Sequence, residues 1–308
     1  MASVDPLVGD NAFKRCFKKF KSRVDPPNCS ELPTFSQLGS RVPSVVLTHG
    51  STFSASNTLK PAESWPIFRC THLPGLVLIR NPFTPHGQLF WGLRCARDFA
   101  RHPPQRTNLD REVDSEANFH WFESAQDDPS LWRKMRWSTL GYHHNWDTKV
   151  YSDQDVSPFP PDLAALTADL ARTAGFPDFR AEAAIVNFYP LDGTLGGHTD
   201  HSEDNLQAPL VSISLGQSAI FLVGGTTKDV EPVPILLQSG DVVIMSGEAR
   251  RAFHGIPRIV RVPQTSPDVS WARRLDQVTN PEFSERDQDF MLKYLDAHRI
   301  NINVRQVH

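Results

Sequence analysis

The sequence predicts an α+β protein whose core is a β-sandwich or a β-barrel. Short apolar runs separated by turn residues follow one another in the second half of the chain, at 183–189, 210–215, 219–223, 235–237 and 242–245. Evenly spaced short strands of this kind are typical of sandwiches and barrels. Helical patterns precede and follow them, at 88–102, 160–175 and 285–298. With 308 residues, 39% of them hydrophobic, the chain can form one large core and a smaller additional layer.

A basic amphipathic helix is predicted at 11–23, where phenylalanines recur at helical spacing among lysines and arginines. One interpretation docks this helix through its phenylalanines and leaves the basic face in water. The other gives that face to the phosphates of a nucleic acid. Residues 24–64 are rich in Pro, Ser and Thr and predict an irregular segment. We therefore divide the chain into an N-terminal extension, 1–75, and a main domain, 76–308.

The later helices carry signals at their ends. The helix at 160–175 begins at prolines and stops at Gly175, the usual places for these two residue types. The last helix has Ser284 as its N-cap and leads to a strand at the C-terminal end of the sequence.

Composition excludes several classes of protein. The net charge of −3 and the pI of about 6.5 exclude a strongly basic polyanion binder, although local basic patches remain. No apolar run approaches the roughly 18 residues of a membrane span, so we expect no membrane partner. The four cysteines have no CxxC spacing and predict reduced intracellular thiols. We expect a monomer.

The stretch "GGHTDH" places His198 and Asp200 two residues apart, so on an extended chain both side chains leave the same face. One histidine and one carboxylate form part of a 2-His-1-carboxylate facial triad, which holds Fe(II) and leaves coordination positions open. His254, which follows a strand bracketed by glycines, is the natural second histidine. His201 is a rival ligand, but on an extended strand it points away from the other two.

The C-terminal strand "RININVR" alternates strictly, and its polar face carries Arg299, Asn301, Asn303 and Arg305. A barrel interior that binds a dicarboxylate needs such guanidinium groups, with amides to complete the hydrogen bonds. A solvent-exposed amphipathic strand is the alternative. In "IVNFYP", Asn187 and Tyr189 add an amide and a phenol to one face of another strand, and both need partners if they are buried.

Four stretches, "NFYPLDGTLGGHTD", "SLGQSAIFLVGG", "SGDVVIMSGEARRAFHGIPRI" and "RININVR", together resemble the AlkB family of Fe(II)- and 2-oxoglutarate-dependent dioxygenases. The resemblance covers roughly residues 135–308. "RWSTLGYHHNW" and the N-terminal basic helix resemble the animal branch numbered one within that family. The resemblance implies a double-stranded β-helix, or jelly-roll, with N-terminal helices, a nucleotide-recognition lid at about 135–160 and a core at about 181–308.

The resemblance also implies the chemistry. It makes His198, Asp200 and His254 the ligands of Fe(II), with 2-oxoglutarate and O2 as cosubstrates. Arg299 is implied to bind the distal carboxylate of 2-oxoglutarate and Arg305 to lie near its other end, and the remaining contacts implied are Asn187, Tyr189, Asn301 and Asn303. The implied reaction hydroxylates a methyl carbon while 2-oxoglutarate gives succinate and carbon dioxide. An N-hydroxymethyl product then loses formaldehyde, whereas a C-hydroxymethyl product persists.

A methylated base must leave its stack to reach the iron, so an aromatic or histidine-lined pocket is expected. The resemblance implies that Tyr142 and His144 contact the base, with Trp137 as a wall of the pocket and Lys228 nearby. His143 is a further candidate, but it is adjacent to His144, so at most one of the two can face the pocket. Ordinary packing of an aromatic-rich lid and a solvated lysine are the alternatives. Bacterial members of the family have a second aspartate two residues after the metal carboxylate. This chain has Ser202 there, so base preference does not carry over.

The branch has been linked to methyl groups on adenine and cytosine in tRNA and on adenine in DNA. We expect a nucleic-acid partner, with tRNA favoured because its loops already present splayed bases, and DNA N6-methyladenine as the alternative. Candidates for a phosphate-binding track are Arg133, Lys134, Arg136, Arg250, Arg251, Arg258 and Arg261. The resemblance implies the mitochondrion, the nucleus or both. A protein hydroxylase of the same class and a non-catalytic metal-binding scaffold are the competing hypotheses.

Overall fold

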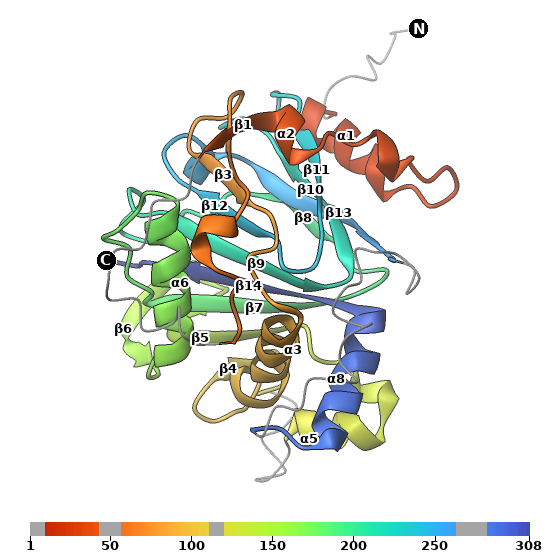
Figure 1. Ribbon diagram of the computed structural model, residues 1–308, viewed down its shortest axis with the longest axis vertical. Coiled ribbons are helices and arrows are strands. Elements are labelled where there is room, and N and C mark those ends of the chain that lie inside the picture. The colour runs from red at the N-terminus through yellow and green to blue at the C-terminus, as the bar shows by residue number, and fades with distance from the viewer. Residues whose placement is uncertain (1–9, 43–56, 111–119, 263–281) are drawn as a thin grey trace, which may run out of the picture.

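Two antiparallel sheets form the centre of the computed structural model, which describes residues 10–42, 57–110, 120–262 and 282–308 (Figure 1). The large sheet has ten strands and the small sheet has four. Helices pack on one face of the large sheet, and the small sheet packs on the other. The predicted α+β class with a sandwich of strands is confirmed.

The large sheet takes strands from nearly the whole length of the chain. In spatial order they are β1 (Gly39–Val42), β2 (Ile67–Cys70), β3 (Leu76–Ile79), β12 (Val242–Met245), β9 (Leu210–Gly216), β14 (His298–Arg305), β7 (Ala183–Pro190), β5 (Trp137–Asn145) and β4 (Arg106–Thr107), while β6 (Val150–Val156) pairs with β5. The last strand of the sequence, β14, therefore lies in the middle of the sheet, between β9 and β7. Ile300 and Ile302 of β14 face the helices, so its polar residues face the small sheet, as the alternation predicts.

The small sheet has the order β11 (Val233–Leu237), β10 (Ser218–Val223), β13 (His254–Val260) and β8 (Leu195–His198). Its strand β10 is buried on both faces. Phe221 packs toward the large sheet with Ile256 and Met245. Ile220 and Leu222 point the other way. An apolar outer face of this kind must be covered by another element.

Helix α1 (Ala12–Lys21) covers that outer face. Its Phe13, Cys16 and Phe20 are buried against β10. Gly197 of β8 allows the close approach, because a Cβ there would lie 2.4 Å from Cε1 of Phe13. The helix thus docks through its phenylalanines, as one of the two interpretations predicts, and it packs directly behind the strand that ends at His198. Its lysines remain exposed.

Four helices cover the opposite face of the large sheet, namely α3 (Pro85–Leu93), α5 (Trp121–Asp127), α6 (Pro161–Thr173) and α8 (Glu285–Ala297). Large buried side chains such as Trp91, Leu166 and Tyr294 form the core between these helices and β14. Helix α8 begins as predicted, since the Ser284 hydroxyl accepts a hydrogen bond from the backbone N–H of Asp287. Within the described residues, no helix is long and apolar enough to span a membrane.

Two expectations from the sequence need correction, and the large sheet also extends across a predicted boundary. The segment expected to be irregular contains a 3-10 turn (Cys29–Glu31), the short helix α2 (Phe35–Leu38) and edge strand β1; its residues 43–56 lie outside the described part of the chain. Because β2 pairs with β3, the large sheet has strands on both sides of the boundary predicted at residue 75. The helix expected at 88–102 begins at Pro85 and continues from Arg94 to Phe99 as a π-helix.

Candidate active site

The three predicted metal ligands meet where two paired strands end. His198 is the last residue of β8 and His254 is the first of β13, and the two are direct cross-strand partners. Asp200 follows two residues after β8. One ligand atom from each of the three side chains lies within 4.8 Å of the other two. The rival His201 is exposed, and its Nδ1 lies 3.1 Å from Oγ1 of Thr199.

Backbone carbonyls fix the protonation of both imidazoles. Nδ1 of His198 lies 3.0 Å from the carbonyl oxygen of Gly196, and Nδ1 of His254 lies 3.1 Å from that of Ala252. A carbonyl oxygen can only accept a hydrogen bond, so each Nδ1 carries the proton and each Nε2 keeps its lone pair. Burial lowers the pKa of His254 to about 4, which keeps that ring neutral. Two imidazoles and a carboxylate are the donor set of a facial-triad Fe(II) site.

Asp200 is held as the carboxylate. Its Oδ1 accepts a hydrogen bond of 3.1 Å from Nη2 of Arg305, and its Oδ2 is buried with no partner among the described residues. Burial favours the neutral acid, but the nearby positive charges, that of Arg305 first and that of Arg250 after it, outweigh burial and hold the pKa of the Asp200 carboxyl well below its usual range. An ionised carboxylate with a buried, unpaired oxygen fits a bound cation.

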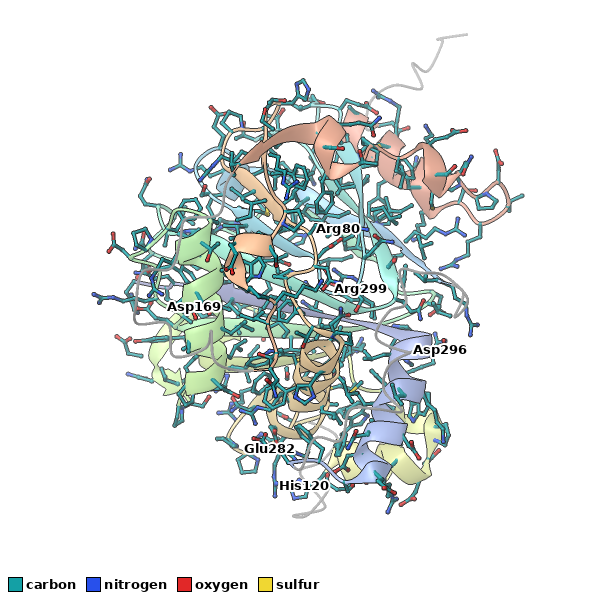
Figure 2. All side chains as sticks on the ribbon, viewed as in Figure 1. Arg80, His120, Asp169, Glu282, Asp296 and Arg299 are labelled. Carbon is teal, nitrogen blue, oxygen red and sulfur yellow. The ribbon has the colours of Figure 1, made fainter. Side chains whose placement is uncertain are left out.

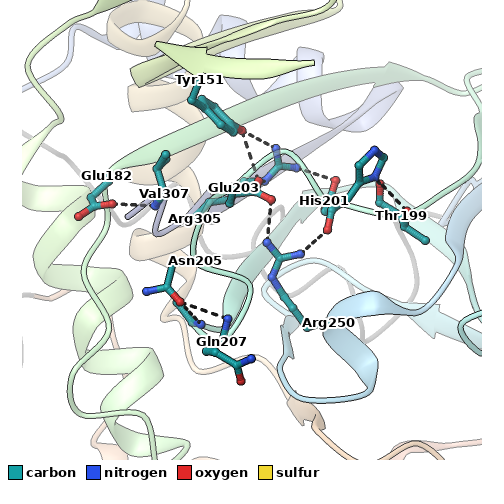
Figure 3. Close-up of polar contacts among 12 residues, drawn as sticks. Tyr151, Glu182, Thr199, His201, Glu203, Asn205, Gln207, Arg250, Arg305 and Val307 are labelled. Carbon is teal, nitrogen blue, oxygen red and sulfur yellow. Dashed lines mark hydrogen bonds and ion pairs between the residues drawn. The ribbon is translucent and has the colours of Figure 1, made fainter. Parts of the chain in front are cut away.

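A second buried carboxylate, that of Glu203, lies between Arg305 and Arg250 (Figure 3), which both also contact Asp200. Nε of Arg305 lies 3.3 Å from Oε1 of Glu203, and Nη1 of Arg305 donates to the Tyr151 hydroxyl at 2.8 Å. Arg250 donates to Oε2 of Glu203 at 2.8 Å and to the backbone carbonyl of Asp200 at 2.6 Å. The expectation that Arg250 contacts phosphate is wrong, because its side chain is 2% exposed and is paired with Glu203.

A cavity of about 340 Å³ lies beside the metal ligands, between the two sheets. Arg299 lines it from β14 and sits in the interior of the molecule (Figure 2). Its Nη2 donates to Oγ of Ser214 at 3.0 Å, whereas Nε and Nη1 are buried without partners in the described part of the chain. Burial lowers the pKa of Arg299 to about 10, so it stays charged at neutral pH. A buried cation with two unused donors fits a carboxylate ligand.

The other polar residues predicted for the cavity line it from β7 and β14, but their hydrogen-bonding states differ. Burial raises the pKa of Tyr189 to about 12, so its phenol remains a hydrogen-bond donor. Asn301 has already used its amide hydrogens, which go to Oγ of Ser212 at 2.8 Å and to the carbonyl of Ile213 at 3.0 Å. Oδ1 of Asn303 is buried and has no partner within the described ranges.

His144 lines the cavity, and the adjacent His143 points elsewhere. His143 is 4% exposed, and its Nδ1 lies 2.8 Å from Oγ1 of Thr139. The ring of His144 lies 4.8 Å from that of Trp146 and 5.2 Å from that of Tyr151. Burial and the charge of Arg305 lower the pKa of His144, so its ring is neutral at neutral pH.

The other predicted substrate contacts are not among the residues that line the cavity. Trp137 comes nearest, since it pairs in register with Asn187 and its ring lies 5.2 Å from that of Trp146. The Tyr142 ring packs 5.1 Å from the ring of His308. Nζ of Lys228 lies 5.1 Å from the centre of the Phe253 ring, close to where α1 begins. The structure therefore does not bring Tyr142 and Lys228 to the cavity.

Sequence reasoning missed several residues that the fold brings to the site, namely Trp146, Lys149, Tyr151 and Glu203. The loop after β5 carries the first two. It is built by Asn145, whose Oδ1 accepts the backbone N–H groups of Asp147 and Thr148, both at 3.0 Å. An asparagine that caps a turn is a recognisable signal, so the loop was open to prediction from the sequence. Its direction toward the cavity was not.

Comparisons with known proteins agree with this geometry. The 2OG-Fe(II) oxygenase superfamily matches residues 75–305. "Nucleic acid dioxygenase ALKBH1" of Homo sapiens is 34% identical over 339 residues, which cover 100% of this chain and 86% of that protein. "DNA N(6)-methyladenine demethylase ALKBH1A" of Arabidopsis thaliana is 32% identical, with 99% of both chains covered. "tRNA demethylase abh1" of Schizosaccharomyces pombe is 38% identical over 177 residues, or 57% of this chain and 53% of that one.

The matched segment contains the metal ligands, the cavity and Arg299. Fe(II) is therefore the cofactor, and 2-oxoglutarate and O2 are the cosubstrates, as predicted. The predicted jelly-roll fold and the predicted dioxygenase class are confirmed as well. Both the superfamily match and the relatives lead to one assignment: the chain belongs to the AlkB family of Fe(II)- and 2-oxoglutarate-dependent dioxygenases.

Proposed function

We propose that this dioxygenase oxidises methyl groups on bases of nucleic acid and that tRNA is its preferred substrate. One observation carries the proposal: the metal ligands, the guanidinium of Arg299 with its two unused donors and the neutral ring of His144 all line one cavity. The names of the relatives support a nucleic-acid substrate, since they include a nucleic acid dioxygenase and a tRNA demethylase. Fe(II) with 2-oxoglutarate and O2 supplies the oxidising chemistry.

In this proposal the side chains bind, orient and exclude water. His198, Asp200 and His254 hold the iron, with both imidazoles oriented by backbone carbonyls. Arg299 binds the distal carboxylate of 2-oxoglutarate, and the phenol of Tyr189 donates a further hydrogen bond nearby. Asn187 and Asn303 complete the polar wall, while Asn301 supports that wall through its own hydrogen bonds to β9. The apolar part of the cavity, with Phe221 and Met245, excludes water from the reacting methyl group.

The methylated base enters past the lid and stacks on aromatic rings. Trp146 is 47% exposed and lines the cavity, with Trp137 and His144 against its ring. An exposed tryptophan at a cavity mouth provides a π-face for a base that has left its own stack. Bases in tRNA loops are already partly unstacked, so less energy is needed to present them. This difference favours tRNA over a paired duplex.

Phosphate contacts are proposed for basic residues that the structure leaves exposed. The exposed face of α1 carries Lys14, Arg15, Lys18, Lys19 and Lys21. Lys134 and Arg136 are exposed just before β5, which carries the lid. Phosphate neutralisation by such residues makes affinity fall with salt. We expect tRNA binding to weaken steeply between 50 and 200 mM salt, by about tenfold or more.

The test is an incubation of the protein with Fe(II), 2-oxoglutarate and total tRNA, followed by mass spectrometry of the nucleosides. Loss of a methyladenosine, or conversion of a methylcytidine to oxidised forms, supports the proposal and names the base. The control is Asp200→Ala, which removes the only anionic member of the metal group and must abolish the change. Unaltered tRNA, with succinate still formed, would reject the tRNA substrate.

DNA N6-methyladenine is the second candidate substrate. The Arabidopsis relative, which is aligned over 99% of both chains, carries that activity in its name. A methylated DNA oligonucleotide offered as a single strand, a bulge and a full duplex distinguishes the two proposals in the same assay. Faster turnover of unpaired DNA than of tRNA would make DNA the preferred substrate.

A further inference from the structure

Glu203, Arg250 and Arg305 (Figure 3) form a closed ring of ion pairs and hydrogen bonds with a fourth charged residue, Asp200, which is one of the metal ligands. Arg305 donates a hydrogen bond to the side chain of Asp200 and forms an ion pair with Glu203, and Arg250 donates hydrogen bonds to Glu203 and to the backbone carbonyl of Asp200. The side chains of the four residues are 1–9% exposed. Two carboxylates and two guanidinium groups carry no net charge. Buried charges are tolerated when they are paired in this way.

Glu203 occupies the point of the ring opposite Asp200. Its Oε2 accepts from Nη2 of Arg250 at 2.8 Å, and its Oε1 lies 3.3 Å from Nε of Arg305. In both of these contacts the partner of the Glu203 oxygen is an arginine and not a metal ligand. Glu203 therefore acts on Asp200 through two arginines, one that holds the carboxylate and one that holds the backbone of the same residue. Without Glu203, both arginines would place an unbalanced positive charge beside a site for a divalent cation.

Tyr151 connects this ring to the lid. It belongs to β6, the outer strand of the β5–β6 hairpin, and its hydroxyl accepts a hydrogen bond of 2.8 Å from Nη1 of Arg305. The same hydroxyl lies 3.5 Å from Oε1 of Glu203. Its ring packs 5.2 Å from that of His144, which lines the cavity. The strand that carries the lid is thus bonded to the arginine that orients Asp200.

We propose that Glu203 and Tyr151 are positioning residues of the metal site: they hold Arg305 against Asp200, and Tyr151 makes this support depend on the position of the lid. Groups that orient a metal ligand from behind affect metal affinity or activity by 10- to 100-fold in other proteins. A lid that moves away would remove the Tyr151 hydroxyl from Arg305 and leave that arginine less constrained. The inference rests on the proposed role of Asp200 as a metal ligand.

The test measures the affinity of the iron-free, full-length protein for Mn2+, by electron paramagnetic resonance of the free ion. Glu203→Gln is expected to raise the dissociation constant about tenfold or more, and Tyr151→Phe by a smaller factor of at least threefold. Asp204→Asn is the matched control, because this neighbouring carboxylate is 82% exposed and pairs with His308 outside the ring. It should leave the constant within a factor of about two of the parent.

Mn2+ affinity of the double variant, Glu203→Gln with Tyr151→Phe, distinguishes a positioning role from a general loss of stability. Both residues act through Arg305, so the combined loss should be smaller than the product of the two single losses. Asp200→Ala serves as the reference: if it binds Mn2+ as tightly as the parent, the metal-ligand assignment itself fails. If Asp200→Ala loses the metal while Glu203→Gln and Tyr151→Phe bind it like the parent, the positioning role is overturned. Should Glu203→Gln fail to fold, Tyr151→Phe decides alone, since it removes a single hydroxyl.

Discussion

Replacing Arg299 should have opposite effects on stability and on cosubstrate binding. Arg299 is 1% exposed, and two of its donor nitrogens have no partner in the described chain. A buried donor without a partner costs about 1–3 kcal/mol. Arg299→Met keeps much of the side-chain volume and removes the charge, so the ligand-free protein should gain about 1–3 kcal/mol in free energy of unfolding. Most substitutions of a fully buried residue have the opposite sign.

Cosubstrate binding should disappear in the same variant. Saturation with 2-oxoglutarate at 100 times its dissociation constant should stabilise the parent protein by about 2.7 kcal/mol. Arg299→Met should lose this stabilisation. Arg299→Lys keeps the charge but cannot form a two-pronged contact with a carboxylate. The loss of one charge-assisted hydrogen bond, about 1.5–3 kcal/mol, should raise KM for 2-oxoglutarate roughly 10- to 150-fold.

Urea unfolding with and without 2-oxoglutarate measures the stability effects, and succinate formation measures KM. Arg180→Met is the control, since Arg180 is exposed and lies outside the cavity; its unfolding free energy should change by less than about 0.5 kcal/mol. The reasoning is refuted if Arg299→Met destabilises the ligand-free protein while 2-oxoglutarate still stabilises it. An unchanged KM in Arg299→Lys would equally reject the two-pronged contact.

Three further predictions concern the lid, the N-terminal helix and the response to acid. Trp146→Ala should raise KM for tRNA roughly 5- to 150-fold, because base stacking contributes about 1–3 kcal/mol, whereas Val156→Ala on the same hairpin should leave KM unchanged. Equal KM values for the two variants in steady-state assays would exclude stacking on Trp146. Phe13→Ala should lower the free energy of unfolding by about 3–5 kcal/mol in urea titrations, and a loss below 1 kcal/mol would mean that α1 is not docked. Burial lowers the pKa of His298 from 6.5 to about 4, so its stabilising effect is complete above pH 6.5 and is lost as pH falls toward 4. His298→Phe should remove about 2–3 kcal/mol of the stability change between pH 8 and pH 4.5, and identical pH profiles would contradict this.

The polar residues of β14 that line the cavity could be predicted from the sequence, because the alternation that reveals them lies within one strand. Strand β14 alternates with a period of two, so a single assignment of the buried face places Arg299 and Asn301 on the side of the small sheet. The pairing of His198 with His254 could be predicted for the same reason, since His198 ends one strand and His254 begins another. Patterns that repeat along one strand need no knowledge of the rest of the chain.

Short and non-local features were harder to predict. Strand β1 has four residues and two of them are exposed, so it has no apolar alternation of its own. It is a strand because β2 supplies its hydrogen-bonding partners. His143 and His144 present a related difficulty: a bulge between β5 and β6 near these residues decides which ring faces the cavity. From their spacing in the sequence, we could predict only that at most one of the two rings faces the cavity.

For the arginines, sequence position did not indicate which side chains are paired with carboxylates and which are available to bind phosphate. Arg250 and Glu203 are 47 residues apart, and nothing in either segment indicates that the two side chains are buried together. Of the arginines considered for a phosphate track, Arg133 also bonds Asp192, and Arg261 bonds Asp296. An arginine with a carboxylate partner has less of its charge available for phosphate. The electrostatic contribution to nucleic-acid binding should therefore come mainly from α1, whose exposed lysines outnumber its acidic neighbours. Because α1 docks on the small sheet through its phenylalanines, this charge lies on the outer surface of that sheet.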